Sequence, residues 1–79
     1  MRYRYEVRLD EGDVGNRVVI RWRRPTADGG DEVADVLGVL EGFEAETFVV
    51  RKASGDVVSI PRERALAAKT VPPASRRVR

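Results

Sequence analysis

The chain has 79 residues, enough for one small domain with one core, and its net charge is +2. It contains neither Cys nor His, which excludes disulfides, thiolate or imidazole metal sites, and catalysis by a Cys nucleophile or a His base. Its apolar runs are far shorter than the roughly 20 residues of a membrane-spanning helix, and no apolar signal segment follows the N-terminus, so we expect a cytoplasmic protein.

Residues 1–14 are predicted to form an arm or a strand ahead of the main domain. Residues 3–9 read Tyr-Arg-Tyr-Glu-Val-Arg-Leu, and this weak alternation of apolar and polar side chains is typical of a strand. Residues 10–13 read Asp-Glu-Gly-Asp, which predicts a turn.

Residues 17–24 are the clearest strand of the chain. Val18, Ile20 and Trp22 alternate with basic residues, and β-branched or aromatic side chains suit a half-buried pleated surface. Pro25 ends the strand, because proline cannot donate to a strand ladder. The opposite face carries a row of basic side chains, namely Arg17, Arg21 and Arg23.

A polar loop over residues 25–32 precedes the second strand, which is predicted over residues 35–43. Gly29 and Gly30 give the loop the freedom that a tight reversal needs. Gly38 lies in the middle of the second strand, and a glycine there is typical of a bulge or a sharp bend. Small barrels need such bends to close.

The third and fourth strands are predicted over residues 47–52 and 57–60. Both are rich in β-branched residues. Residues 41–46 cover the reversal before the third strand. Residues 53–56, Ala-Ser-Gly-Asp, form the short hairpin loop between the two strands.

The C-terminal part predicts one short turn and a closing strand. Proline is tolerated in the first turn of a helix, so residues 61–65 predict a single 3-10 or α turn, and residues 66–71 return as a strand. The alternative is a helix over residues 62–69, which are rich in helix formers but make only a marginal helix at this length. Residues 74–79 are predicted to be a flexible basic tail.

This order of elements predicts an all-β fold. Short strands with closely spaced turns are typical of a barrel or a sandwich. A strand, a long polar loop, a bent strand, two tight hairpins and a one-turn helix before a last strand give the layout of a small SH3-like barrel. We therefore predict such a barrel over residues 15–73, with about five antiparallel strands and one short 3-10 or helical turn.

Residues 15–73 resemble the SH3-like domain at the N-terminus of certain actinobacterial proteins of the GNAT acetyltransferase superfamily. The resemblance rests on four segments in matching order, which are residues 15–21 (Gly-Asn-Arg-Val-Val-Ile-Arg), 35–40 (Asp-Val-Leu-Gly-Val-Leu), 55–61 (Gly-Asp-Val-Val-Ser-Ile-Pro) and 67–73 (Ala-Ala-Lys-Thr-Val-Pro-Pro). In that family an acetyltransferase domain follows the barrel. Here the chain leaves no room for that domain, and no Gly-rich loop opens a helix to hold a pyrophosphate. The resemblance therefore implies the accessory module without the catalytic domain.

The arginine row is the first candidate for a binding surface. Arg17, Arg21 and Arg23 share one strand face, and Trp22 is their neighbour in sequence. Basic side chains beside an aromatic have the chemistry to contact a phosphate backbone and to stack a base. The alternative, which the alternation favours, places Trp22 in the core and the arginines on a solvated face.

The charges of the chain are segregated. Residues 1–24 carry a net +3, residues 25–61 a net −6 and residues 62–79 a net +5. Such asymmetry is typical of a surface for nucleic acid or an acidic partner; the alternative is that opposite blocks face one another across the fold. The last block holds the second group of candidate residues, Lys69, Arg76 and Arg77. This group either attracts nucleic acid or only solubilises the terminus.

Other kinds of site have weaker support. Asp28, Asp31, Glu32 and Asp35 cluster around the first long loop, but they lack the Asp-x-Asp-x-Asp-Gly order and the distal Glu of a calcium loop. The segments with which SH3 domains bind proline-rich peptides are absent. No His is present to activate a Ser or Thr, and no pair of carboxylates stands out as acid and base. We therefore expect no metal, no cofactor and no enzyme activity.

The sequence thus predicts a non-catalytic SH3-like binding module, used for protein–protein interaction or as a regulatory accessory domain. One alternative is a nucleic-acid-binding small β-barrel. The other is a regulatory partner of a separately encoded acetyltransferase. We expect the partner to be another protein, with nucleic acid as the weaker option and no membrane.

Overall fold

The computed structural model describes residues 7–72. Its elements are, in chain order, the 3-10 helix η1 (Glu11–Asp13), the strands β1 (Arg17–Pro25), β2 (Asp31–Glu44), β3 (Thr47–Lys52) and β4 (Val57–Pro61), the 3-10 helix η2 (Arg62–Arg64) and the strand β5 (Ala65–Thr70). Residues 3–6 of the predicted N-terminal strand and the tail predicted over residues 74–79 lie outside the described residues.

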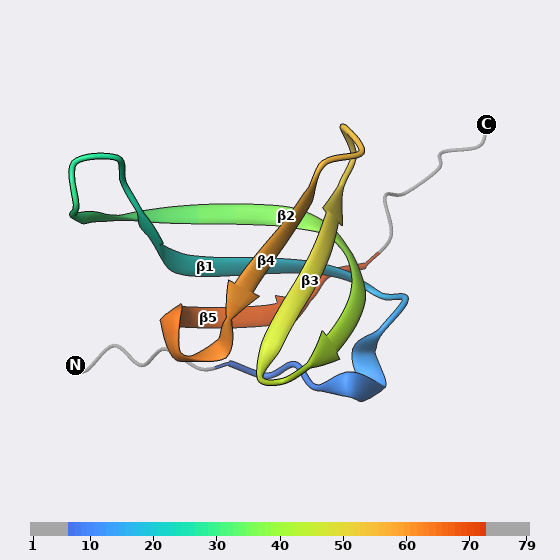
Figure 1. The fold of residues 1–79 in the computed structure, drawn as a ribbon. Helices are drawn as coiled ribbons and strands as arrows, with labels where there is room; N and C mark the ends of the chain where they lie inside the picture. Colours follow the sequence, from blue (N-terminus) through green and yellow to red (C-terminus); the bar gives the residue numbers. More distant parts are fainter. Residues whose placement is uncertain (1–6, 73–79) are drawn as a thin grey trace, which may run out of the picture.

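The five strands form one antiparallel sheet in the order β4-β3-β2-β1-β5. The sheet curls so that β3 and β4 run across the other three strands (Figure 1). The predicted all-β fold of about five strands is confirmed, with two short 3-10 turns in place of the one predicted. No helix within residues 7–72 is long and apolar enough to cross a membrane.

One face of each strand supplies the core. In β1 the buried residues are Val18, Ile20 and Trp22, as the alternation predicts. No described polar or charged side chain is buried, so hydrophobic burial is the main source of stability in this core. The whole buried set is apolar and comes from every strand and from the segment before η1: Leu9, Val18, Ile20, Trp22, Val36, Leu40, Phe48, Val50, Ile60 and Ala68.

β2 begins earlier than predicted. Its first residues pair with the end of β1, Asp31 with Pro25 and Glu32 with Arg24, and extend the hairpin into the region predicted as loop. The loop itself is reduced to residues 26–30. The β1–β2 hairpin consequently projects beyond the barrel (Figure 1).

Gly38 marks a close approach of backbones rather than a bulge. The register shift of β2 lies between Leu40 and Gly42, so the prediction of a bulge at Gly38 is wrong. Gly38 is buried, and a Cβ added to it would lie 2.3 Å from the carbonyl oxygen of Arg51 in β3. Only a residue without a side chain allows the two strands to come this close.

The turn between β2 and β3 is a two-residue loop made of Ala45 and Glu46. Both residues have positive φ, 54° and 56°. This backbone suits the twist of a tight hairpin, and it is the conformation for which Asn and Gly are preferred. The positive-φ conformation costs a residue with a Cβ about 1–2 kcal/mol, so the turn is strained in this chain.

Glu46→Gly is expected to stabilise the domain by about 0.5–1 kcal/mol, because glycine takes a positive φ without steric cost. Urea unfolding followed by circular dichroism measures the change. Glu46→Ala is the matched control: it removes the carboxylate but keeps the Cβ, and we expect it to leave the free energy of unfolding unchanged. A destabilised Glu46→Gly variant would contradict the strain in this turn.

The chain after β4 forms a turn and then a strand, as predicted, and not the alternative helix. η2 is a single 3-10 turn, and β5 then runs antiparallel to β1. The segment before η1 lies along the other edge of β5, where Val7 bridges Ala68 in parallel and the Arg8 amide donates to the Ala68 carbonyl at 2.9 Å. Leu9 then enters the core. Residues 7–9 therefore belong to the barrel.

Candidate functional site

The candidate site is the outer face of β1, β2 and β5, meaning the face turned away from the core. The register places four outward side chains of β1 opposite four of β2, so that one continuous surface forms. The outward residues are Arg17, Val19, Arg21 and Arg23 of β1, Val33, Asp35, Leu37 and Val39 of β2, and Ala67 and Lys69 of β5.

The structure brings together four of the seven predicted site residues. Arg17, Arg21 and Arg23 follow one another on the outer face of β1, and Lys69 stands across from Val19 on β5. Arg17 is half-buried, while the other three are exposed. A residue 46 positions further along the chain than Arg23 thus joins the arginine row, because β5 pairs with β1.

The other three predicted residues are not part of this surface. Trp22 is only 7% exposed and belongs to the core cluster. Its inward position, which the alternation favours, removes it from the candidate surface, so the described residues place no aromatic ring on the outer face of β1, β2 and β5. Arg76 and Arg77 lie outside the described residues.

Arg21 is engaged by a carboxylate on the neighbouring strand. Its Nε and Nη2 donate to the two oxygens of Asp35 at 2.8 and 3.1 Å. This hydrogen bonding to Arg21 holds the pKa of Asp35 below its ordinary value. Both side chains are about half exposed, so the pair fixes orientation more than it stabilises the fold.

Asp31 and Glu32, two of the acidic residues around the first loop, pair with arginines, whereas Asp28 bonds within the loop. Glu32 pairs with Arg24, and Asp31 pairs with Arg64 at 3.1 Å. Asp28 accepts hydrogen bonds from the Thr26 hydroxyl and the Gly30 amide, and these bonds lower its pKa. Within residues 7–72 no three carboxylates gather into a possible metal site. For Asp31 and Glu32 the interpretation of opposite charge blocks facing one another holds.

An apolar strip crosses the outer face, formed by Val19, Leu37 and Val39. Val19 and Leu37 are cross-strand partners, and Val39 follows Leu37 on the same face of β2. Leu37 is 46% exposed and Val39 is 41% exposed, whereas Val19 is half-buried. Sequence reasoning missed the strip, although a signal existed: residues 36–40 read Val-Leu-Gly-Val-Leu, which puts apolar side chains on both faces of the strand.

Two cations border the apolar strip, and a third lies on the same face beyond the Arg21–Asp35 pair. Arg17 stands opposite Val39, Lys69 stands opposite Val19, and Arg23 lies further along β1. Among the described residues these three side chains form no ion pair, in contrast to Arg21. The surface therefore combines exposed apolar area with positive charge that the fold itself does not neutralise.

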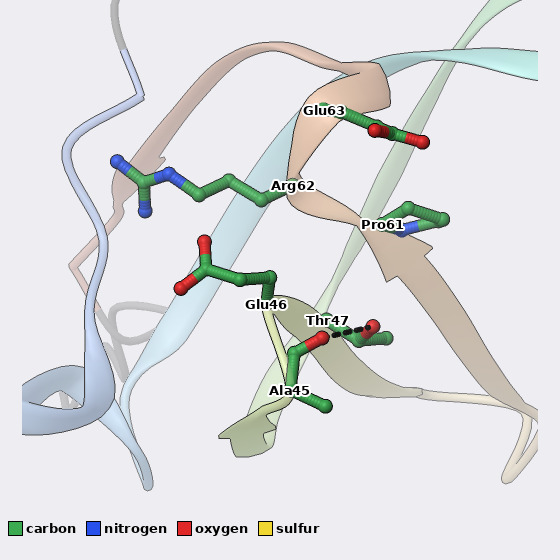
Figure 2. A pocket seen from close by; sticks show the side chains of 6 residues that line it. All are labelled: Ala45, Glu46, Thr47, Pro61, Arg62 and Glu63. Atoms are coloured by element: carbon green, nitrogen blue, oxygen red, sulfur yellow. Dashed lines mark hydrogen bonds between the residues drawn. The ribbon is translucent and has the colours of Figure 1, made fainter.

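A second feature is a hollow beside the strained β2–β3 turn. It is lined by Ala45, Glu46 and Thr47 on one side and by Pro61, Arg62 and Glu63 on the other (Figure 2). The Arg62 amide donates to the Glu46 carbonyl at 2.9 Å and ties the two sides together. Two carboxylates and one guanidinium line the hollow.

Comparison with known proteins gives one match. The model of a family described as the Rv0428c N-terminal Sm-like domain matches residues 12–69. The matched segment runs from within η1 to Lys69, and so covers β1 to β4 completely and β5 except for Thr70. No curated protein and no solved structure matches the chain.

Proposed function

Since the chain belongs to the Rv0428c N-terminal Sm-like domain family, a family of small β domains, we propose that it is a non-catalytic binding module that contacts another protein through the outer face of β1, β2 and β5. The observation that carries the proposal is the apolar strip of Val19, Leu37 and Val39 with cations on its border. The absence of His and Cys from the sequence supports the non-catalytic part.

The strip supports a protein partner because exposed apolar side chains that lie together are typical of interaction surfaces. Its residues sit on two paired strands in the middle of the sheet and not on a loop. Binding there requires little ordering of the backbone, and this lowers the entropic cost of association.

The unpaired cations favour a partner with acidic residues near its own apolar contacts. Charges at the rim of an interface guide the encounter and select partners more than they add affinity. Arg17, Arg23 and Lys69 are placed for this role, while Arg21 is held by Asp35.

Leu37→Glu is expected to lower the recovery of a partner at least tenfold, because it places a carboxylate in the apolar contact; a tenfold loss corresponds to about 1.4 kcal/mol. The measurement is quantitative mass spectrometry of proteins retained by the purified domain from extracts of its source cells. Leu37 is exposed, so the substitution leaves the core untouched.

Val14→Glu is the matched control, since Val14 is 45% exposed and lies outside the strands. This variant is expected to retain the same proteins as the unmodified domain. The proposal is wrong if the unmodified domain retains nothing above a scrambled-charge domain, or if Leu37→Glu retains its proteins equally well.

Nucleic-acid binding is the second candidate, favoured by the three cations without ion pairs on one face. Fluorescence anisotropy with single- and double-stranded oligonucleotides at two salt concentrations separates it from the first. Binding that weakens with salt would support it, because affinity follows the number of neutralised phosphates. No binding at low salt would end it.

The resemblance to domains that precede acetyltransferases suggests which protein to test first. An acetyltransferase encoded beside this chain is the first protein to test for retention by the purified domain. Its retention by the unmodified domain and its loss with Leu37→Glu would identify the domain as a regulatory partner of that enzyme.

A further inference from the structure

β4 is an edge strand with a free side. It stands last in the sheet order, and nothing within residues 7–72 pairs with the edge that faces away from β3. The other end of the sheet is different, because the Val7 bridge and the Arg8 amide occupy the outer edge of β5. Among the described residues β4 is therefore an end strand of the sheet whose outer side has no backbone partner.

Hydrogen-bonded residue pairs alternate with non-hydrogen-bonded pairs between β3 and β4, and this alternation shows which backbone groups of β4 point away from β3. The Lys52 amide donates to the Asp56 carbonyl at 2.8 Å, and the Arg62 amide donates to the Glu46 carbonyl at 2.9 Å. Hydrogen-bonded pairs alternate along an antiparallel ladder, so Val58 and Ile60 bond to β3. The amides of Val57 and Ser59, and the carbonyls of Val57, Ser59 and Pro61, point away from β3.

Apart from its short length and Pro61, nothing in β4 protects this edge. Natural edge strands are usually defended by short length, by lysine or other charges, by proline or by a bulge. β4 reads Val-Val-Ser-Ile-Pro, with no charged residue, and its pairing with β3 is regular. Pro61 blocks one amide at the end of the strand, while Val57 is 48% exposed.

We propose that two copies of the chain associate through their β4 edges, antiparallel about a two-fold axis that passes between the two Ser59 residues. The sequence of β4 is self-complementary in this register. Each Ser59 amide donates to the Ser59 carbonyl of the second copy, and each Val57 amide donates to its Pro61 carbonyl. The missing amide of Pro61 leaves one Val57 carbonyl unpaired at each end, where solvent is available.

Side chains also match in this register. Val57 stands across from Pro61 of the second copy on the outward face, so apolar residues meet there; on the other face Ile60 is already fully buried in the core of its own barrel. An isologous contact of this kind closes after two copies and does not propagate into a filament.

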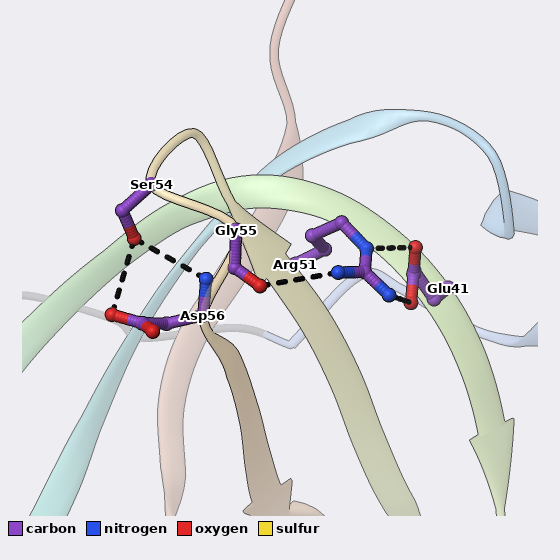
Figure 3. A network of polar contacts seen from close by, with 5 residues as sticks. All are labelled: Glu41, Arg51, Ser54, Gly55 and Asp56. Atoms are coloured by element: carbon purple, nitrogen blue, oxygen red, sulfur yellow. Dashed lines mark hydrogen bonds and ion pairs between the residues drawn. The ribbon is translucent and has the colours of Figure 1, made fainter.

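The β3–β4 hairpin holds the edge in place (Figure 3). Arg51 donates to both oxygens of Glu41 at 2.6 and 3.1 Å, and to the Gly55 carbonyl at 3.1 Å. Ser54 donates to the Asp56 carboxylate at 3.2 Å, and the Asp56 amide donates back to the Ser54 hydroxyl at 3.3 Å. The edge is thus presented in one conformation, which reduces the ordering that pairing requires.

The test is the oligomeric state of the full chain, measured by sedimentation velocity over a series of concentrations. We expect the 8.8 kDa chain to form a dimer whose fraction rises with concentration, since a five-residue edge makes a small and weak interface. Ser59→Pro removes the amide that bonds across the axis but takes no bond from the β3–β4 ladder. It is expected to raise the dissociation constant at least tenfold, while Ser59→Ala, which keeps the amide, leaves it unchanged.

A second variant covers the case in which Ser59→Pro does not fold. Val57→Lys places a cation in the contact with Pro61 of the second copy, where a lysine protects an edge strand against pairing, and is also expected to abolish dimers, whereas Val14→Lys, at a site of similar exposure, leaves them intact. Leu37→Glu, which disrupts the outer face, is expected to leave the dimer unchanged. The failure of this inference can therefore be distinguished from the failure of the proposed function.

Amide exchange identifies the edge directly. In the dimer the Val57 and Ser59 amides become protected relative to dilute protein. The inference is overturned if the unmodified chain stays monomeric at the highest soluble concentration, if it forms larger rings, or if Val57→Lys dimerises as well as Val14→Lys does.

Discussion

Phe48→Ala is expected to destabilise the domain by about 3–5 kcal/mol, the usual cost of removing a buried phenyl ring. Phe48 is fully buried, and its ring stacks on Phe43 with 4.7 Å between centroids and 26° between planes. The Arg62 guanidinium lies over both rings, 6.0 Å from each centroid. The ring therefore joins β2, β3 and η2, and alanine would leave a cavity that these elements cannot fill.

Urea unfolding followed by circular dichroism measures this effect. Domains are typically stable by only about 5–15 kcal/mol, so we expect Phe48→Ala to be largely unfolded on mild heating. Leu37→Ala is the control, because Leu37 is apolar but exposed, and surface substitutions usually change stability by less than about 0.5 kcal/mol. Similar losses in the two variants would contradict the assignment of Phe48 to the centre of the core.

Gly38→Ala is expected to cost about 3 kcal/mol, at the upper end of the range for overpacking a core. The new Cβ would lie 2.3 Å from the carbonyl oxygen and 2.8 Å from the carbonyl carbon of Arg51, and 2.9 Å from a methyl group of Val50. The first two atoms belong to the backbone of β3, which cannot move without breaking its pairing with β2 or β4. The strands must separate to admit the methyl group.

Gly42→Ala is the matched control, because Gly42 lies in the same strand and a Cβ added there has no atom within 4 Å. We expect no loss, or a gain of about 0.4–1 kcal/mol from the stiffer unfolded chain. Chemical denaturation of both variants under one set of conditions gives the comparison. Equal destabilisation would show that Gly38 acts through its backbone freedom and not through the close approach to β3.

The fold was predictable where a single face of a strand is apolar. In β1, Val18, Ile20 and Trp22 alternate with arginines, and this alone indicates the strand, its buried face and the position of Trp22. The start of β2 was not predictable in this way. Asp31 and Glu32 look like loop residues, but their backbone pairs with Pro25 and Arg24 of β1, and their side chains form ion pairs with Arg64 and Arg24.

Only part of the candidate site could be predicted from the sequence. The row of Arg17, Arg21 and Arg23 follows from the period of the strand, but the ion pair that occupies Arg21 depends on the register between β1 and β2. The exposure of Leu37 could not be read from sequence, since apolar residues on both faces of β2 give no sign of which face turns outward. The strained turn was hidden because neither Ala nor Glu indicates positive φ.

The pairing of β5 with β1 limits the rate at which this barrel folds. The contacts β1–β2, β2–β3 and β3–β4 join neighbours in sequence, whereas Val18 reaches Thr70 across about fifty residues. Closing so long a loop lowers the entropy of the chain before the contacts between β1 and β5 can form. Folding therefore becomes slower as the share of pairings between distant residues rises. We therefore expect the consecutive hairpins to form early and the docking of β5, with Leu9 beside it, to be the late step of folding.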